Sequence, residues 1–280
     1  RAGGFGRDSG NGISVFTDGS VIITGGFEGS ALFGDKKIES NGGSDIFVAK
    51  LNAIGEFDWV TSAGSTGYSS DDYGYSVSIN DNGSSLITGS FKGSTNFGST
   101  NLTAGDANGD IFAAKLTANG SFEWATSAKG GFGRTSGKSQ GNSIASFKDG
   151  SAIITGSFAG SILFDNTMLS SSLFDVFIAK LNFDGTFDWA IKAGSGYFDN
   201  GYSVSPLSDG SAIVAGSTSN AAQFGETTIL GSNPGAFVAK VTSSGEFGLD
   251  PRNGSIAILD DENSSIINEE GNCVFITAKD

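Results

Sequence analysis

The sequence predicts an all-β protein, namely a five-bladed β-propeller of four-stranded antiparallel blades whose fifth blade is incomplete. The first reason is a repeated phrase, Asp-Ile-Phe-Val-Ala-Lys followed after a turn by Phe-Asp-Trp, which places Trp59, Trp124 and Trp189 at intervals of 65 residues. The second is that segments between these phrases alternate apolar and polar residues, as half-buried strands do, with no helical period. Stacking such units around an axis buries both faces of every sheet.

The repeat divides nearly the whole chain, so we expect one domain spanning residues 1–280. The predicted repeats are about residues 10–73, 74–140, 141–200 and 201–250, followed by a degenerate repeat at 251–280. Residues 2–7 closely match residues 129–134 in sequence. This match predicts that the chain begins with the tail of a repeat and is a piece of a longer protein.

Each repeat opens with a predicted β-hairpin, for which the second repeat serves as an example. Residues 75–79 alternate as a half-buried first strand, and Asn82-Gly83 supplies the turn, because both residues tolerate the positive φ of tight hairpins. The second strand, here residues 86–89, is richer in β-branched residues and more continuously apolar than the first, which is typical of a strand buried on both faces.

The second half of each repeat begins with its longest and most variable connection. A phenylalanine recurs there and is expected to tuck the loop against the sheet; its positions are Phe33, Phe97, Phe164 and Phe224. A third strand follows, as at residues 110–115, and a Gly-bearing turn leads to the fourth strand with its Trp. The spacing of the Trp residues and their outer-strand position predict packing between blades rather than sugar stacking.

The last repeat departs from the pattern. Three strands are expected, at residues 255–258, 265–267 and 275–279, and the outer strand is missing. Since propellers commonly close by pairing strands from the two chain ends, we expect this strand from sequence beyond either end or from a neighbouring copy. Cys273 is the single cysteine, so it forms no internal disulfide and is expected to be a small buried hydrophobe.

Composition excludes several classes of function. The formal charge of −14, with only 16 Lys and Arg, opposes binding to nucleic acid. No apolar run approaches the roughly 18 residues of a membrane helix, so no membrane insertion is expected. The absence of His from the sequence removes Ser-His-Asp triads and His-ligated metals.

The third strands end in Lys residues, each with an acidic residue on the following strand. These pairs predict cross-strand ion pairs on the surface, and they are Lys50 with Asp58, Lys115 with Glu123, Lys180 with Asp188 and Lys240 with Glu246. Exposed pairs of this kind contribute on the order of 0–1 kcal/mol, so we expect no functional site there.

The loop that leads into each first strand is the best candidate for a binding site, because in propellers such loops open near the axis. Carboxylate and phenol groups recur there, and the candidate ligand-binding residues are Asp8, Asp72, Tyr75, Asp199 and Tyr202. They could bind a glycan or Ca²⁺. The alternative is that the Asp side chains only cap turns through local hydrogen bonds.

A second candidate is a local metal site in the second repeat. Asp106, Asn108 and Asp110 carry oxygen ligands at alternate positions around a glycine, as calcium loops do. The remaining positions of an EF-hand are missing. Ca²⁺ is therefore the cofactor that this chain could bind, and no other is indicated.

The repeated phrases resemble the bacterial β-propeller repeat often called the SBBP repeat and, more distantly, the NHL repeat. The resemblance covers almost all of residues 10–247 and rests on Gly-Tyr-Ser-Val, Asp-Gly-Ser, Ile-Ile-Thr-Gly-Ser-Phe and Phe-Asp-Trp. It implies a secreted or cell-surface bacterial protein in which the propeller serves binding or structure. It carries no catalytic motif.

We therefore expect a non-catalytic extracellular or cell-surface module with a structural or interaction role. Its expected partner is a protein or a neighbouring subunit, and a glycan is the alternative, which would make the chain a Ca²⁺-dependent or glycan-binding lectin. A glycosidase is a third hypothesis, since some propellers use a pair of carboxylates. Near-identical loops argue against it, because a catalytic acid and base need unlike surroundings.

Overall fold

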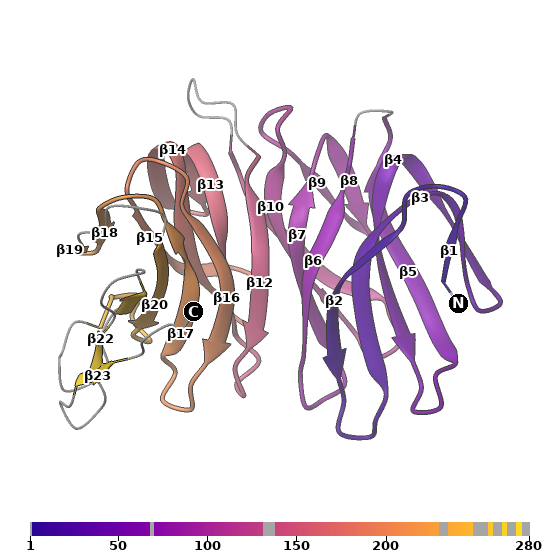
Figure 1. Ribbon diagram of the computed structural model, residues 1–280. Coiled ribbons are helices and arrows are strands. Elements are labelled where there is room, and N and C mark those ends of the chain that lie inside the picture. Colours follow the sequence, from indigo (N-terminus) through magenta and orange to yellow (C-terminus); the bar gives the residue numbers. More distant parts are fainter. Residues whose placement is uncertain are drawn as a thin grey trace, which may run out of the picture.

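The computed structural model describes residues 2–67, 70–130, 138–229, 235–248, 257–259, 265–267 and 273–275. Within these residues the secondary structure consists of β-strands, with no helix, and the strands pair antiparallel (Figure 1). The predicted all-β class is therefore confirmed. The described part of the chain also contains no helix that could cross a membrane.

Four successive units share one strand order, in which first, second, third and fourth strands are neighbours in the sheet. Their bounds are as follows: β2 Ser9–Val15, β3 Val21–Phe33, β4 Lys36–Leu51 and β5 Phe57–Ser65 in unit 1; β6 Tyr73–Ile79, β7 Ser85–Phe91, β10 Asp110–Leu116 and β11 Phe122–Ala128 in unit 2; β12 Gln140–Ser146, β13 Ala152–Phe164, β14 Thr167–Leu181 and β15 Phe187–Gly194 in unit 3; β16 Asn200–Pro206, β17 Ala212–Thr218, β20 Gly235–Val241 and β21 Ala257–Leu259 in unit 4. The remaining strands are β1 Ala2–Gly4, β8 Ser94–Phe97, β9 Thr100–Thr103, β18 Ala222–Phe224, β19 Thr227–Ile229, β22 Ser265–Ile267 and β23 Cys273–Phe275.

The turn between first and second strands has the predicted chemistry. In unit 1 the Asp18 carboxylate accepts hydrogen bonds from the Ser20 amide at 2.8 Å and the Ser20 hydroxyl at 2.6 Å. The same Asx–Ser arrangement recurs in the other three units, at Asn82–Ser84, Asp149–Ser151 and Asp209–Ser211. A short side chain that bonds its own main chain fixes each hairpin register.

The long connection between second and third strands is a hairpin that reaches the preceding unit. In unit 2 it is β8–β9, and Gly64 of β5 pairs with Asn96 of β8. Equivalent contacts join Lys129 to Leu163 and Ala193 to Phe224. The recurring Phe of this hairpin is at most 2% exposed in every unit, so the predicted packing of Phe33, Phe97, Phe164 and Phe224 is confirmed.

Strand β1 occupies the place that the end of a fourth strand takes in the other units. Ala2 pairs with Phe33, and Gly3 pairs with Leu32, on the hairpin of unit 1. Strand β1 therefore pairs as the end of a fourth strand does, which agrees with the sequence match between residues 2–7 and 129–134. The structural match differs by one residue from the sequence match, because Gly3 rather than Ala2 stands where Lys129 stands opposite Leu163.

Each Trp lies across a junction between units. Its indole Nε1 donates to a main-chain carbonyl in the third-to-fourth-strand turn of the next unit, in the pairs Trp59 to Ala118 (3.1 Å), Trp124 to Phe183 (3.1 Å) and Trp189 to Ser243 (3.0 Å). Its ring covers a glycine of that turn, at Gly120, Gly185 and Gly245. The predicted role of Trp in packing between units is confirmed.

The first strands form the other side of each junction. Strands β2, β6, β12 and β16 lie next to one another in sequence order (Figure 1). Ser76 and Ser78 accept hydrogen bonds through Oγ from the Ile144 and Ser146 amides, at 3.2 and 3.1 Å. The four-stranded sheets of successive units therefore pack face to face, with the apolar core between them, while the long hairpins pair with the edge of the preceding sheet.

The C-terminal prediction is partly wrong. Residues 257–259 pair with β20, with Leu259 opposite Ala236, and so complete unit 4 as its fourth strand instead of opening a fifth repeat. Strands β22 and β23 pair antiparallel with Ile267 opposite Cys273, the same register that places Val15 of β2 opposite Val21 of β3. Cys273–Phe275 thus pairs as a second strand, and residues 276–279 of the predicted third strand lie outside the described residues.

The predicted ion pairs form at two of the four positions. Lys115 contacts Glu123 at 3.1 Å, and Lys180 contacts Asp188 at 3.7 Å. Lys240 instead contacts Asp209 of the first turn at 3.4 Å. Lys50 lies over the Phe16 ring, 4.9 Å from its centroid. In units 1 and 4 the Lys side chain therefore contacts a residue beside or in the turn between first and second strands, and its partner differs from unit to unit.

The glycine turns under the Trp rings provide a matched test of this packing. Gly185 has φ +88°, and a Cβ built there lies 2.8 Å from the Trp124 ring; Gly55 has φ +85°, but no described atom outside its chain neighbours is within 4 Å of such a Cβ. Gly55→Ala should cost only the left-handed backbone strain, roughly 1–2 kcal/mol. Gly185→Ala should cost a further roughly 1–3 kcal/mol from overpacking. Urea unfolding measures both, and equal losses would contradict the proposed packing.

Candidate functional site

The lead-in loops before the first strands hold two fully buried carboxylates, Asp72 and Asp199. Asp72 Oδ2 accepts the Ser65 amide at 2.8 Å and the Ser65 hydroxyl at 2.9 Å, and Oδ1 accepts the Lys92 amide at 2.7 Å. Asp72 therefore ties the end of the fourth strand of unit 1 to the end of the second strand of unit 2. Burial raises the pKa of Asp72, and these hydrogen bonds oppose the rise.

Asp199 repeats this arrangement at the junction of units 3 and 4. It accepts the Ser195 amide at 2.5 Å and the Ser219 amide at 2.6 Å. Burial raises the pKa of Asp199, and the nearby charge of Asp175 raises it further. For both carboxylates the structure shows the main-chain capping that the sequence left as an alternative. Ligand binding by them stays a prediction.

Asp8 has the same position in unit 1 but is exposed. Its Oδ2 accepts the Gly4 amide at 2.6 Å, which corresponds to the bond from the Ser65 amide to Asp72. The five predicted ligand-binding residues are thus spread over the lead-in loops of units 1, 2 and 4, and they do not converge on one another in a single described cavity.

The two predicted tyrosines lie in different surroundings. Tyr75 stacks on Tyr73, with ring centroids 6.1 Å apart, and its hydroxyl accepts a hydrogen bond from Lys138 Nζ at 2.8 Å. The Lys138 ammonium also lies over both rings, at 5.0 and 5.5 Å. Tyr202 is 58% exposed. Tyr202 lies in β16, and Tyr197 and Phe198 on the loop just before this strand are 53% and 60% exposed.

The predicted calcium loop is held by its own hydrogen bonds. Asp106 Oδ1 accepts the Asn108 amide at 2.7 Å, and the Asn108 side chain donates to Oδ2 at 3.3 Å. Asp110 is fully buried and accepts the Gly105 and Gly130 amides, both at 2.8 Å. Burial raises the pKa of Asp110, and Asp106 raises it further. Among the described residues no three His, Cys, Asp or Glu side chains group closely enough to hold a metal, so calcium binding stays a prediction.

Two further carboxylates, Asp45 in β4 and Asp175 in β14, were not predicted as site residues from the sequence. They are at most 2% exposed, and one oxygen of each, Oδ1, has no hydrogen-bond partner among the described residues. Asp175 Oδ2 pairs with Lys192 at 2.7 Å, whereas Asp45 Oδ2 accepts the Asn41 amide at 2.9 Å. Their recurrence with Asp110 in the repeated phrase was the signal that could have found them.

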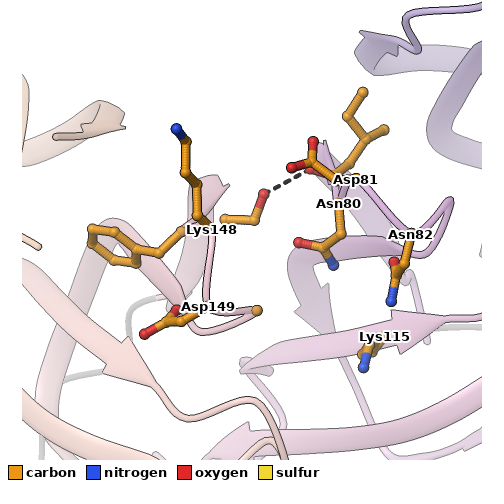
Figure 2. Close-up of a pocket in the computed structure, with 10 residues that line it drawn as sticks. Asn80, Asp81, Asn82, Lys115, Lys148 and Asp149 are labelled. Carbon is orange, nitrogen blue, oxygen red and sulfur yellow. Dashed lines mark hydrogen bonds between the residues drawn. The ribbon is translucent and has the colours of Figure 1, made fainter. Parts of the chain in front are cut away.

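A shallow cavity of about 320 Å³ opens at the opposite edge of the sheets, between the first turns of units 2 and 3. Figure 2 shows Asn80, Asp81 and Asn82 on one side of it and Lys148 and Asp149 on the other. Phe147, Lys148 and Asp149 also line a second cavity towards Leu207. The sequence predicted these residues only as turns. Charges of both signs line the cavity, so it selects no ligand charge.

The fold and these sites define an all-β repeat protein of antiparallel four-stranded units. No family model matches the chain, and no curated protein matches it significantly in sequence. Among solved structures, a protein of unknown function from Bacteroides caccae aligns with 12% identity over 72% of this chain and 88% of that chain. The TM-score is 0.25, too low for this similarity to carry an argument about fold or function.

The raised pKa of Asp45 predicts a pH-dependent stability. Burial raises this pKa from 3.8 to about 7, so between these values the folded state holds a proton that the unfolded state has released. The free energy of unfolding should therefore fall as the pH rises through this range. Asp45→Asn removes this titration. The free energy of unfolding of the variant minus that of the wild type should therefore increase by at least about 1 kcal/mol when the pH is raised from 5 to 8.

Urea unfolding of both proteins at the two pH values measures this difference. The exposed Asp81→Asn provides the control for a lost carboxylate in the same protein. Parallel pH dependence of the wild type and Asp45→Asn would show that Asp45 does not titrate in this range.

Proposed function

We propose that this chain forms most of a five-bladed β-propeller and acts as a non-catalytic structural or interaction module of an extracellular or cell-surface protein. The arrangement of the first strands supports the propeller, because the innermost strands of successive blades are neighbours around an axis. The hairpin β22–β23 supports a fifth blade, since it has the register of the opening hairpin of a unit. The resemblance to the SBBP repeat supports the extracellular setting.

One observation carries the interaction role: aromatic side chains are exposed on the lead-in loop of unit 4 and on the strand that follows it, β16. Tyr197, Phe198 and Tyr202 are each more than half exposed, and Phe198 stacks on Phe174 with centroids 5.7 Å apart. Aromatic groups held in place by stacking lose little entropy on binding and are enriched at protein interfaces. A protein or a neighbouring subunit is therefore the proposed partner.

The buried carboxylates support a non-catalytic role. Asp45 lies close enough to Asp72 for its pKa to respond to that charge, and Asp199 responds likewise to Asp175. These are the closest counterparts of a glycosidase pair that we find among the described residues. All four side chains are at most 2% exposed, so a sugar ring has no access to them. Asp45, Asp72 and Asp199 accept main-chain amides, and Asp175 pairs with Lys192.

A glycan is the second candidate partner, and the stacked pair Tyr73–Tyr75 under Lys138 favours it. Two parallel rings beside an ammonium group could receive the apolar face of a sugar and one of its polar substituents. Ca²⁺ at the loop of Asp106, Asn108 and Asp110 belongs to this second candidate. It would raise the thermal unfolding midpoint at millimolar Ca²⁺ after chelation.

Binding to immobilised polysaccharides and surface proteins tests the interaction role. The double variant Phe198→Ser, Tyr202→Ser should weaken binding at least about tenfold, because truncating central aromatic residues of an interface costs roughly 2 kcal/mol or more. Phe183→Ser is the matched control, since Phe183 is equally exposed but lies on a third-to-fourth-strand turn.

Two results would contradict the proposal. One is that no panel member binds. The other is that the double variant and Phe183→Ser behave alike. Loss of binding only when Tyr73 and Tyr75 are both changed, with polysaccharides as ligands, would favour the glycan candidate instead.

A further inference from the structure

The three junctions between units share one set of contacts on the later unit. We call the side of a unit that faces the preceding one its front face. A glycine in the first strand meets a threonine of the preceding second strand, in the pairs Gly74 with Thr24, Gly141 with Thr88 and Gly201 with Thr155. A Cβ at any of these glycines would collide with the Thr hydroxyl, so glycine permits the close approach.

Unit 1 has the same glycine with nothing against it. Gly10 pairs with Gly25 as Gly74 pairs with Gly89. No described atom outside its chain neighbours comes within 4 Å of a Cβ built at Gly10. The front face of unit 1 therefore carries the residue type required for close packing, at a position where this structure packs nothing.

The Trp contact is also half complete in unit 1. Gly55 takes the place of Gly120, Gly185 and Gly245 in the third-to-fourth-strand turn and shares their positive φ. Each of the latter three lies under a Trp ring, whereas no described atom outside the chain neighbours of Gly55 comes within 4 Å of a Cβ built on it. The carbonyl of Ala53 corresponds to those that accept the Trp Nε1 hydrogen bond.

The exposure of the apolar residue in the middle of the first strand is the third difference between unit 1 and the later units. Val77, Ile144 and Val204 are between 4% and 7% exposed, because the preceding unit covers them. Ile13, which has the same register against its second strand, is 68% exposed, and Val15 is 59% exposed. The sequence thus places apolar side chains on a strand face that the described chain leaves in water.

We propose that the front face of unit 1 docks one further four-stranded unit of this same repeat, whose fourth strand runs into β1. That unit would place a Trp on Gly55 and an apolar sheet face on Ile13, and Gly10 leaves room for its second strand. The direction follows from β1, which already pairs with the unit 1 hairpin as the ends of β5 and β15 pair with the next hairpin. In the proposed five-bladed ring this unit is the fifth blade: β22–β23 has the register of its first two strands, and β1 continues its fourth strand. The inference therefore rests on the proposed function.

A second copy of the described chain fits this face less well. Its exposed sheet would be that of unit 4, where Ala215 replaces the Thr. Trp189 is the last Trp of the chain and is already engaged with Ser243. Unit 4 therefore presents neither the Thr that meets a glycine at the other junctions nor a free Trp for Gly55.

A fusion tests the proposal directly. A copy of residues 138–192, which contains Ser143, Thr155 and Trp189, is placed immediately before Ala2. Ala2 then follows the copied Lys192 as Ala193 does in unit 3, and it pairs with Phe33 as Ala193 pairs with Phe224. The copied Ser143 should accept the Ile13 amide, as Ser143 accepts the Val204 amide at 3.2 Å. Hydrogen exchange at Ile13 should slow at least about tenfold, and the thermal midpoint should rise by several degrees.

Two variants control for nonspecific effects. Gly10→Leu should leave the original chain unchanged but abolish the gain in the fusion, whereas Gly74→Leu should destabilise both proteins. Changing the copied Trp189 to Ala should also reduce the gain, while the copied strands keep their own exchange protection.

Three outcomes would overturn the inference. The first is a folded copy that leaves exchange at Ile13 unchanged. The second is a copy that stays unfolded, since the front face is expected to hold it. The third is concentration-dependent association of the original chain, seen by sedimentation and abolished by Gly10→Leu, which would assign the face to a second copy. None of these depends on the aromatic residues of unit 4, so the proposed binding role can fail separately.

Discussion

Stacking of each Trp on the glycine turn of the next unit is the contact on which the repeated architecture depends. It holds the fourth strand of one unit to the outer turn of the next, while the Gly–Thr contact holds the first strand of the next unit against the preceding second strand. The hairpin that crosses back to the preceding fourth strand gives a third point of attachment. Three separated contacts fix the orientation of two sheets, which a flat apolar interface alone would leave free to slide.

Buried carboxylates accompany the close approach of the sheets. Where the fourth strand ends and the hairpin begins, main-chain amides lose water, and Asp72 and Asp199 accept their hydrogen bonds. Asp110 does the same for Gly105 and Gly130. Asp45 is less well compensated, and its raised pKa reflects burial without a cationic partner such as Lys192 gives to Asp175.

The division between repeated and variable residues bears on function. Polar groups that recur in every unit mostly form hydrogen bonds between units. Their recurrence is therefore explained by structure and does not indicate a ligand. Residues that differ between units are the ones left at the surface, including Tyr197 and Phe198 at one edge and Lys148 beside the cavity at the other. A repeat scaffold of this kind keeps its junctions alike and places specificity in the loops.

The sequence by itself determined the unit: its alternating strands, its Asx–Ser turns, its recurring Phe and the packing role of Trp all follow from local period and chemistry. Tertiary structure alone decided which polar residues are buried, because Asp45 and Asp175 lose solvent only when other segments of the fold cover them. It likewise decided that residues 257–259 complete unit 4, since a short apolar segment can pair with any free edge. Whether Gly10 and Ile13 are packed or exposed depends on a neighbouring sheet and not on their own strand, because period-2 alternation specifies a face but not what covers it.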